Sequence, residues 1–270
     1  MGILNVTPDS FAEPIPKIDP GVAVEAGLRL EREGADLIDV GGESTRPGAD
    51  MVSADEERSR VLPVVAALAE RASVPISIDT YKRDVACAAI DAGADLVNDI
   101  SGLRNDPAMA GVIAASGAAL VLMHTRGASK TMYAEAAYKD VVSEVIAELS
   151  ERIHAAEAAG VAPERVIVDP GIGFAKRAPH SYGVLAHLPQ LAEALGRPLL
   201  VGPSRKSYLR EAVDGRPALQ RDWGTAAAVT AAVLAGAHIV RVHAVEEMRQ
   251  VVRVAEEIRR HAFSSERVSE

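Results

Sequence analysis

The residues best suited to chemistry in this chain are polar side chains at the ends of short, almost continuous apolar runs. In chain order they are Asn5, Asp39, Asp79, Asn98, His124, Asp169, Ser204, Lys206, Arg241 and His243. Carboxylates accept hydrogen bonds and amides both donate and accept them, so together they can pair along a flat edge. The three aspartates and Asn98 therefore suit a planar heterocycle with amidine-like groups.

Arg241 and His243 form a second group. They alternate along one apolar run, so their side chains point the same way, and Asn5 lies on the neighbouring strand if a barrel closes. A guanidinium and an imidazole can bind a phosphate or diphosphate, and Mg²⁺ could bridge that anion to the Asn5 oxygen. We therefore predict an anion pocket opposite the carboxylates. The segment GPSRKS, residues 202–207, lacks the spacing of a P-loop.

These residues allow two other interpretations. A binuclear metal hydrolase would need several histidines, typically an HxH on its first strand, and this chain offers only Asn5 there. A strand-end aspartate can instead cap the following helix, and that alternative stays open above all for Asp39, which precedes GGEST.

The elements that would position these residues repeat along the whole chain. Each apolar run is followed by a Gly- or Pro-marked loop and then a segment of helical periodicity, and the pattern recurs through the chain. The expected helices are 20–34, 54–72, 82–92, 106–116, 135–160, 180–196, 222–236 and 244–262. This predicts an α/β fold, a single-domain (β/α)8 TIM barrel over residues 1–262 with a frayed tail at 263–270. A doubly wound sheet is the rival, but it would scatter the polar strand ends.

Composition limits the possible partners. The net charge is −9, so there is no overall positive field to attract nucleic acid or an anionic membrane surface. Apolar residues are 48% and aromatic residues 3%, which favours aliphatic helices packed on a parallel sheet. The lone Cys87, expected to be buried, indicates a reducing, cytoplasmic location. Trp223, the one tryptophan, is expected to pack on a helix face.

Two long loops follow the first and second apolar runs, at residues 5–20 and 41–53. Both are rich in Gly, Pro, Ser and Thr, and long loops at a barrel mouth usually serve function. Phe11 and Arg46 would be costly to expose without use. We expect these loops to close over a site.

Eight short motifs, in order and one for each strand end, closely resemble the dihydropteroate synthases of the folate pathway. They are MGILNVTPDSF (1–11), DVGGESTRPGA (39–49), SIDTYK (77–82), VNDISG (97–102), MH (123–124), DPGIGFAK (169–176), SRKS (204–207) and RVH (241–243). The resemblance runs from Met1 to about residue 255. Any one motif would be weak, but together they are highly specific.

The resemblance implies a pterin-binding barrel that joins 7,8-dihydropterin-6-ylmethyl diphosphate to 4-aminobenzoate, giving 7,8-dihydropteroate and pyrophosphate. The implied pterin contacts are Asp79, Asn98, Asp169, Phe174 and Lys206. The implied pyrophosphate contacts are Asn5, Arg46, Arg241 and His243, with Asn5 as the Mg²⁺ ligand. The implied aminobenzoate contacts are Phe11, Thr45, Arg46, Pro47 and Ser207. The implied catalytic residues are Asp39, Asp79, Lys206, Arg241 and His243.

The mechanism implied for such an enzyme is dissociative, with C–O cleavage before attack by the amine. Carboxylates near the developing cation and cations near the departing pyrophosphate would stabilise both ends of the breaking bond. The resemblance also implies a homodimer. No obvious insertion lies beside residues 11–13 or 45–47 that would exclude sulfonamides, which mimic aminobenzoate, so we expect ordinary inhibition by these drugs.

The chain departs from the family pattern in places. The first loop carries extra prolines between Ala12 and Pro20, Arg126 adds a cation after the fifth run, and Ala244 replaces a frequent aspartate. Two alternatives therefore stay open: a paralogue that binds pterin without turnover, and a pterin-dependent methyltransferase.

Overall fold

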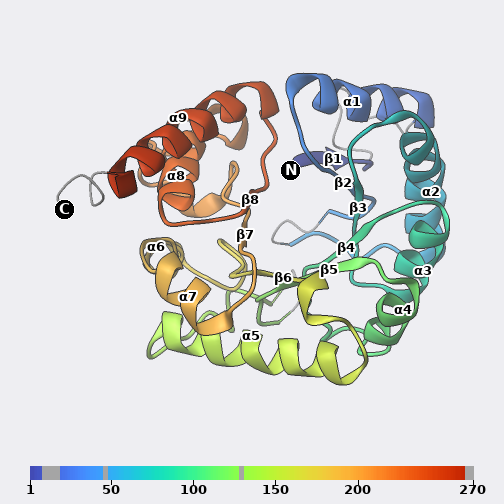
Figure 1. Ribbon diagram of the computed structural model, residues 1–270, viewed down its shortest axis with the longest axis horizontal. Helices are drawn as coiled ribbons and strands as arrows, with labels where there is room; N and C mark the ends of the chain where they lie inside the picture. The colour runs from blue at the N-terminus through green and yellow to red at the C-terminus, as the bar shows by residue number, and fades with distance from the viewer. Residues whose placement is uncertain (8–18, 45–47, 128–130, 265–270) are drawn as a thin grey trace.

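The computed structural model describes residues 1–7, 19–44, 48–127 and 131–264. Within these ranges, short parallel strands lie at the centre and helices surround them (Figure 1). The strands are β1 Gly2–Asn5, β2 Ile38–Gly41, β3 Ile76–Asp79, β4 Leu96–Asp99, β5 Ala119–Met123, β6 Val166–Asp169, β7 Leu200–Val201 and β8 Ile239–Val240. The helices are α1 Pro20–Glu33, α2 Ala54–Arg71, α3 Arg83–Asp91, α4 Met109–Ser116, α5 Val141–Ala158, α6 Ala178–Ala186, α7 Leu188–Leu195, α8 Asp222–Leu234 and α9 Val245–Ser264.

The strands close into a barrel. β1 to β6 form one continuous parallel ladder, and β7 pairs with β8. Two isolated bridges join these sheets: Val168 pairs with Leu199 between β6 and β7, and Gly2 pairs with Val242 between β8 and β1. Each strand thus has a neighbour on both sides, which confirms the predicted (β/α)8 barrel.

Burial of both faces of each strand explains why the apolar runs are nearly continuous. Each strand buries one face against the helices and the other inside the barrel, so both faces must be apolar. The lower barrel is filled by a small cluster of Met1, Leu96, Val121 and Leu200. Nearer the carboxyl ends the inward positions turn polar, at Asp39, Ser77, Asn98 and Asp169. The barrel therefore has an apolar floor and a polar mouth.

The helix expected at 180–196 is two helices, α6 and α7, which meet at His187. Pro189 has no N–H to donate to the carbonyl four residues earlier, and its ring crowds that carbonyl. The chain instead closes a tighter turn, in which the His187 N–H bonds to Val184 O at 3.1 Å. The single-helix prediction was wrong for this local reason.

The helix expected from residue 135 begins only at Val141. Asp140 caps it, because its side chain accepts from the N–H groups of Val142 and Ser143 at 3.0 and 3.2 Å. The last helix, α9, runs to Ser264, and residues 265–270 lie outside the described ranges. None of the described helices combines the length and apolar character needed to span a membrane.

Two expectations about burial were wrong. Cys87 is exposed on α3, because its neighbours Val85 and Ala86 take the buried face of that helix. Trp223 is 89% exposed at the start of α8, where Thr225 and Ala228 take the buried positions. In both helices the helical periodicity was predicted correctly, but one residue was placed on the wrong face of the helix.

Candidate active site at the carboxyl ends of the strands

Arg241 joins two of the predicted carboxylates. Its Nε lies 2.6 Å from Asp39 Oδ2, and its Nη2 lies 2.7 Å from Asp79 Oδ2. Asn98 Nδ2 donates to the same Asp39 oxygen at 3.0 Å. Asp39 therefore does not cap a helix. The predicted separation between the carboxylates and the cations is not seen, because the Arg241 guanidinium lies between Asp39 and Asp79.

Each of these two carboxylates keeps one oxygen free among the described residues. Asp39 Oδ1 and Asp79 Oδ1 are buried, and neither has a hydrogen-bond partner in the described part of the chain. A buried polar atom without a partner is costly, so these oxygens are suited to accept from a ligand. Burial raises the pKa of Asp79 to about 7, against the opposing effect of Arg241. This carboxyl group can thus both donate and accept near neutral pH.

Lys206 approaches from the other side of the mouth. Its Nζ donates to Ile172 O at 2.6 Å and lies 4.5 Å from the centre of the Phe174 ring. Burial lowers the pKa of Lys206 to about 8, while Asp169 acts to raise it. A Cβ atom at Gly202 would come within 3.6 Å of Lys206 Nζ and 3.9 Å of Asp169 Oδ2. Glycine therefore leaves space where these groups converge.

The turn that carries Lys206 is fixed by the start of α8. Arg205, in the left-handed region at φ 57°, makes a two-point ion pair with Asp222 at 2.7 and 2.8 Å. Arg221 Nη1 donates to the carbonyls of Arg205 and Lys206 at 3.1 and 3.2 Å. Such bidentate contacts set direction as well as distance, and they explain how an irregular segment can aim Lys206 into the mouth.

The remaining predicted residues lie around this centre. Asn5 pairs in register with Gly41, which pairs with Asp79, so Asn5 lies in the same row as the carboxylate two strands away. His243 Nδ1 lies 2.9 Å from Ser204 Oγ. Ser207 Oγ lies 2.9 Å from the Tyr133 hydroxyl, a contact that the sequence did not predict.

Four of the five predicted aminobenzoate contacts fall outside the described residues: Phe11, Thr45, Arg46 and Pro47. Most of the proline-bearing first loop does so as well. The structure therefore places Ser207 alone from that set.

Arg126 was expected as an extra cation at the mouth. It instead pairs with Glu144 and Glu148 of α5, with Nη2 2.7 Å from Glu144 Oε2, and it lies over the Tyr138 ring at 4.1 Å. Its charge is thereby matched by two carboxylates. The nearby sequence did signal this, because Glu144 and Glu148 lie four residues apart on one helix face.

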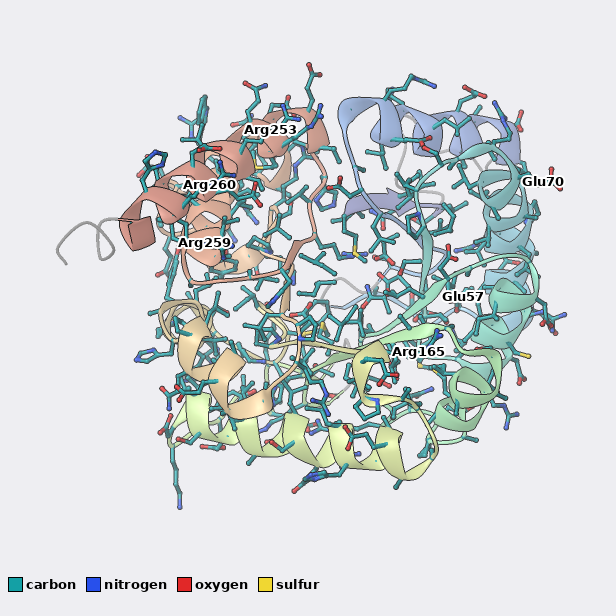
Figure 2. The ribbon with its side chains drawn as sticks, in the orientation of Figure 1. Glu57, Glu70, Arg165, Arg253, Arg259 and Arg260 are labelled. Atoms are coloured by element: carbon teal, nitrogen blue, oxygen red, sulfur yellow. The ribbon has the colours of Figure 1, made fainter. Side chains whose placement is uncertain are left out.

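A second polar group was missed at the β2 and β3 ends. Lys82 Nζ pairs with both Glu43 and Glu57, and the Tyr81 hydroxyl donates to Glu43. Figure 2 shows Glu57 on the inner side of α2, whereas Glu70 on the same helix points outward. Glu57 is 1% exposed. A glutamate among the apolar positions of a helix was the available signal.

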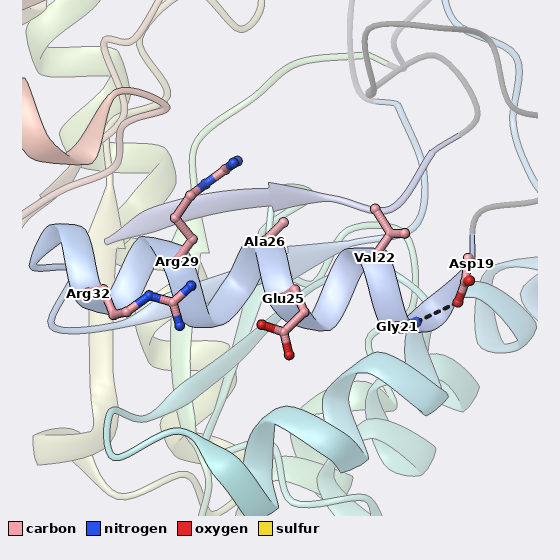
Figure 3. A pocket seen from close by; sticks show the side chains of 7 residues that line it. All are labelled: Asp19, Gly21, Val22, Glu25, Ala26, Arg29 and Arg32. Carbon is pink, nitrogen blue, oxygen red and sulfur yellow. Dashed lines mark hydrogen bonds between the residues drawn. The ribbon is translucent and has the colours of Figure 1, made fainter.

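A groove also runs along the outer surface of α1 (Figure 3). It is lined by Asp19, Gly21, Val22, Glu25, Ala26, Arg29 and Arg32. None of the predicted site residues lines it, and the buried oxygens Asp39 Oδ1 and Asp79 Oδ1 lie at the mouth of the barrel instead.

Comparison with known proteins agrees with this geometry. The family described as pterin binding enzyme matches residues 1–243. A protein of Synechocystis sp. named dihydropteroate synthase is 45% identical over 256 residues, covering 95% of this chain and 88% of the relative.

Two solved structures match with similar extent. Xanthomonas albilineans dihydropteroate synthase with 4-aminobenzoic acid has a TM-score of 0.89 and 43% identity, covering 96% of this chain and 92% of that one. The Yersinia pestis enzyme in a sulfonamide drug complex has a TM-score of 0.91 and 42% identity, covering 96% and 93%. By sequence, fold and the polar groups at its mouth, this chain belongs to the pterin binding enzyme family.

Proposed function

We propose that this chain performs the reaction for which its relatives are named, joining 7,8-dihydropterin-6-ylmethyl diphosphate to 4-aminobenzoate and releasing pyrophosphate. The observation that carries the proposal is the buried pair of free oxygens, Asp39 Oδ1 and Asp79 Oδ1, beside Asn98 and Arg241. An aminopyrimidinone ring presents N–H groups that can donate to Asp79 Oδ1, and Asp39 Oδ1 lies ready to face a cation that forms on the same ligand.

The pterin ring binds between the two sides of the mouth. Asp79, Asn98 and Asp169 hold its donor edge, and Lys206 donates to its acceptor atoms. Phe174 lies against the Lys206 ammonium and offers a flat apolar surface to the ring. The convergence of Lys206 Nζ and Asp169 Oδ2 near Gly202 supports this placement.

The diphosphate lies toward Asn5, Arg241 and His243, and the resemblance adds Arg46, which lies outside the described residues. Among the described residues there is no group of three or more His, Cys, Asp or Glu side chains that could hold a metal alone. The hard amide oxygen of Asn5 fits Mg²⁺, and Asn5 is the residue that would hold this ion beside the diphosphate. When bound, Mg²⁺ neutralises charge on the diphosphate.

The chain favours a dissociative reaction. Asp39, together with Asp79 in its ionised form, places negative charge beside the cation that forms on the pterin, while Arg241 and His243 neutralise the departing group. Arg241 contacts both carboxylates, so a shift of its guanidinium toward diphosphate would free them at the moment that the cation forms. The aminobenzoate amine is unprotonated at neutral pH and needs no strong base.

Aminobenzoate and the sulfonamides that mimic it bind beside Ser207. The resemblance adds Phe11, Thr45, Arg46 and Pro47 to this pocket, and these four lie outside the described residues. The protein acts as a homodimer through its last helices, where Trp223, Val254 and Ile258 are exposed. A cytoplasmic location fits the exposed, unpaired Cys87.

The deciding experiment measures pyrophosphate release from the dihydropterin diphosphate with Mg²⁺, with and without 4-aminobenzoate. We expect release that depends on aminobenzoate and falls by at least about a hundredfold in Asp79→Ala and Lys206→Ala. The exposed Lys139→Ala is the matched control and keeps full activity. Pterin binding without release in the wild type would instead indicate a paralogue without turnover, and methyl transfer to a corrinoid would indicate the methyltransferase.

Sulfonamide inhibition is tested in the same assay. Sulfamethoxazole should compete with aminobenzoate, so that raising aminobenzoate restores the rate. Unimpaired turnover at millimolar drug would contradict the proposed aminobenzoate pocket.

A further inference from the structure

Lys176 is a buried lysine that the proposed reaction does not use. It is 1% exposed, and its Nζ lies beneath the loop that follows β6. Carbonyl oxygens of Gly171 and Phe174 lie 3.2 Å from Nζ, and His124 O lies 3.4 Å away. The fourth contact is His124 Nδ1 at 2.7 Å. A single amino group thus joins the end of β5 to two points of one loop.

The loop around Lys176 has little freedom. Gly171 has φ 69°, and a Cβ there would lie 1.9 Å from His124 O, so the chain passes directly over the end of β5. Ala175 also lies in the left-handed region, at φ 47°. Such a backbone persists only when its surroundings hold it, and the Lys176 contacts supply that hold from below.

The same loop forms one wall of the proposed pterin site. Ile172 O accepts from Lys206 Nζ at 2.6 Å, and the Phe174 ring lies 4.5 Å from that nitrogen. Both groups lie between Gly171 and Ala175 in the chain. Lys176 therefore holds the loop segment that positions Lys206, although the atoms that contact Lys176 Nζ differ from those that contact Lys206 Nζ.

His124 completes the arrangement from β5. Burial lowers the pKa of His124 to about 4, so the imidazole is neutral at pH 7. Burial also lowers the pKa of Lys176 well below its ordinary value. Lys176 Nζ and His124 Nδ1, 2.7 Å apart, share one hydrogen bond, and the second ring nitrogen of His124 is Nε2. That nitrogen lies 3.3 Å from Glu148 Oε2. Arg104 and Arg126 pair with the same carboxylate and hold it.

We propose that Lys176 is a positioning residue for pterin recognition: by binding three backbone carbonyls and His124, it fixes the β6–α6 loop so that Ile172 O and Phe174 hold Lys206 toward the pterin. The inference rests on the proposed function for the identity of the ligand. It predicts an effect on the pterin and not on aminobenzoate, which binds elsewhere at the mouth.

The test uses Lys176→Met, which keeps the volume of the side chain and removes its donors. The probe is 6-hydroxymethyl-7,8-dihydropterin, titrated by calorimetry, and steady-state rates give KM for both substrates. We expect pterin affinity to fall on the order of ten- to a hundredfold, with KM for the pterin diphosphate rising in parallel. KM for aminobenzoate should stay within about twofold, as should every parameter of the exposed control Lys139→Met.

A double-mutant cycle separates positioning from a general loss of order. If Lys176 acts through Lys206, then Lys176→Met should change pterin affinity by less than about twofold in a Lys206→Met background. A full effect in that background, or unchanged pterin affinity in folded Lys176→Met, would overturn the proposal.

If Lys176→Met does not fold, His124→Asn replaces it in the same cycle. That variant removes one Nζ contact and leaves the three carbonyls, so a smaller loss coupled to Lys206 is expected. Additive losses would overturn the proposal. Because pterin binding is measured directly, a wild type that binds pterin but releases no pyrophosphate would refute the proposed function and leave this test intact.

Discussion

Asp79 has a carboxyl group at the mouth whose ionisation is changed by folding. Its pKa is about 7 in the folded protein because burial disfavours the charge, against an ordinary value of 3.8. Between about pH 4 and 7 the folded state therefore holds a proton that the unfolded chain has lost. The contribution of this group to the free energy of unfolding must fall as pH rises through that window.

Asp79→Asn removes this titration. The unfolding free energy of the wild type minus that of Asp79→Asn should therefore decrease steadily from about pH 4 to 7, as measured by urea denaturation at each pH. A difference that stays constant, or grows with pH, would contradict a raised pKa at this position.

Lys206 predicts a second effect of pH, which acts on pterin affinity and not on the free energy of unfolding. Its pKa of about 8 means that the ammonium is lost within reach of ordinary assays. Pterin affinity of the wild type should fall as pH rises through about 8, and the ratio of wild-type to Lys206→Met affinity should approach one above that pH. The ratio isolates Lys206 from titration of the pterin itself. A ratio independent of pH would show that the charge does not contribute.

At the scale of residues, the sequence predicted which groups gather but not how they pair. Strand-end polar residues stand out because their neighbours are apolar, so Asp79, Asn98 and Asp169 could be found. The pairing of Arg241 with Asp39 joins residues 202 apart in the chain and follows from barrel closure. Lys176 was missed because its partners are mostly backbone carbonyls, and sequence carries little sign of these.

Among the elements, α8 has a role beyond covering the barrel, since its first turn holds the segment that bears Lys206. Asp222→Asn would weaken the two-point pair with Arg205 and loosen that segment. We expect a loss of about 1 kcal/mol in stability, with an increase in KM for the pterin diphosphate. Denaturation and steady-state kinetics measure both.

The matched control for Asp222→Asn is Glu257→Gln, which breaks the exposed Arg260–Glu257 pair on α9. Exposed pairs contribute little, so neither stability nor KM should change. If both variants behaved alike, the first turn of α8 would not position Lys206.

Helices and strands were well predicted as types of element, because the hydrophobic periodicity and the Gly and Pro residues that mark the loops agree over most of this chain. Boundaries failed where one residue overrides the pattern, as Pro189 does between α6 and α7, and as Asp140 does at the start of α5. The phase of a helix is harder still to predict in alanine-rich segments, because alanine fits either face. That ambiguity hid the exposure of Cys87 and Trp223.

For the whole molecule, the exposed apolar side chains of the last helices suggest an association surface. Trp223 is 89% exposed, Val254 61% and Ile258 52%. If these residues meet a second copy, Trp223→Glu should weaken the dimer by more than about tenfold in dissociation constant. Sedimentation across a range of concentrations measures this. A wild type that sediments as a monomer throughout would refute the homodimer.

Barrel closure was predictable as a class but not in its detail. The repeated strand–helix unit and its total length favour closure, and the resemblance agreed. The sequence did not indicate that β7 and β8 would be so short, or that single bridges at Val168 and Gly2 would join them to the other strands.

The exposure of Trp223 also determines what the intrinsic fluorescence of the protein can report. It is the sole indole in the chain, and it stands in water while the core around the strands contains none. Its emission should already resemble that of an unfolded peptide, so melting of the barrel will change it little. Unfolding therefore has to be followed by circular dichroism. A blue shift of the emission on raising the protein concentration would instead report that another surface has covered Trp223.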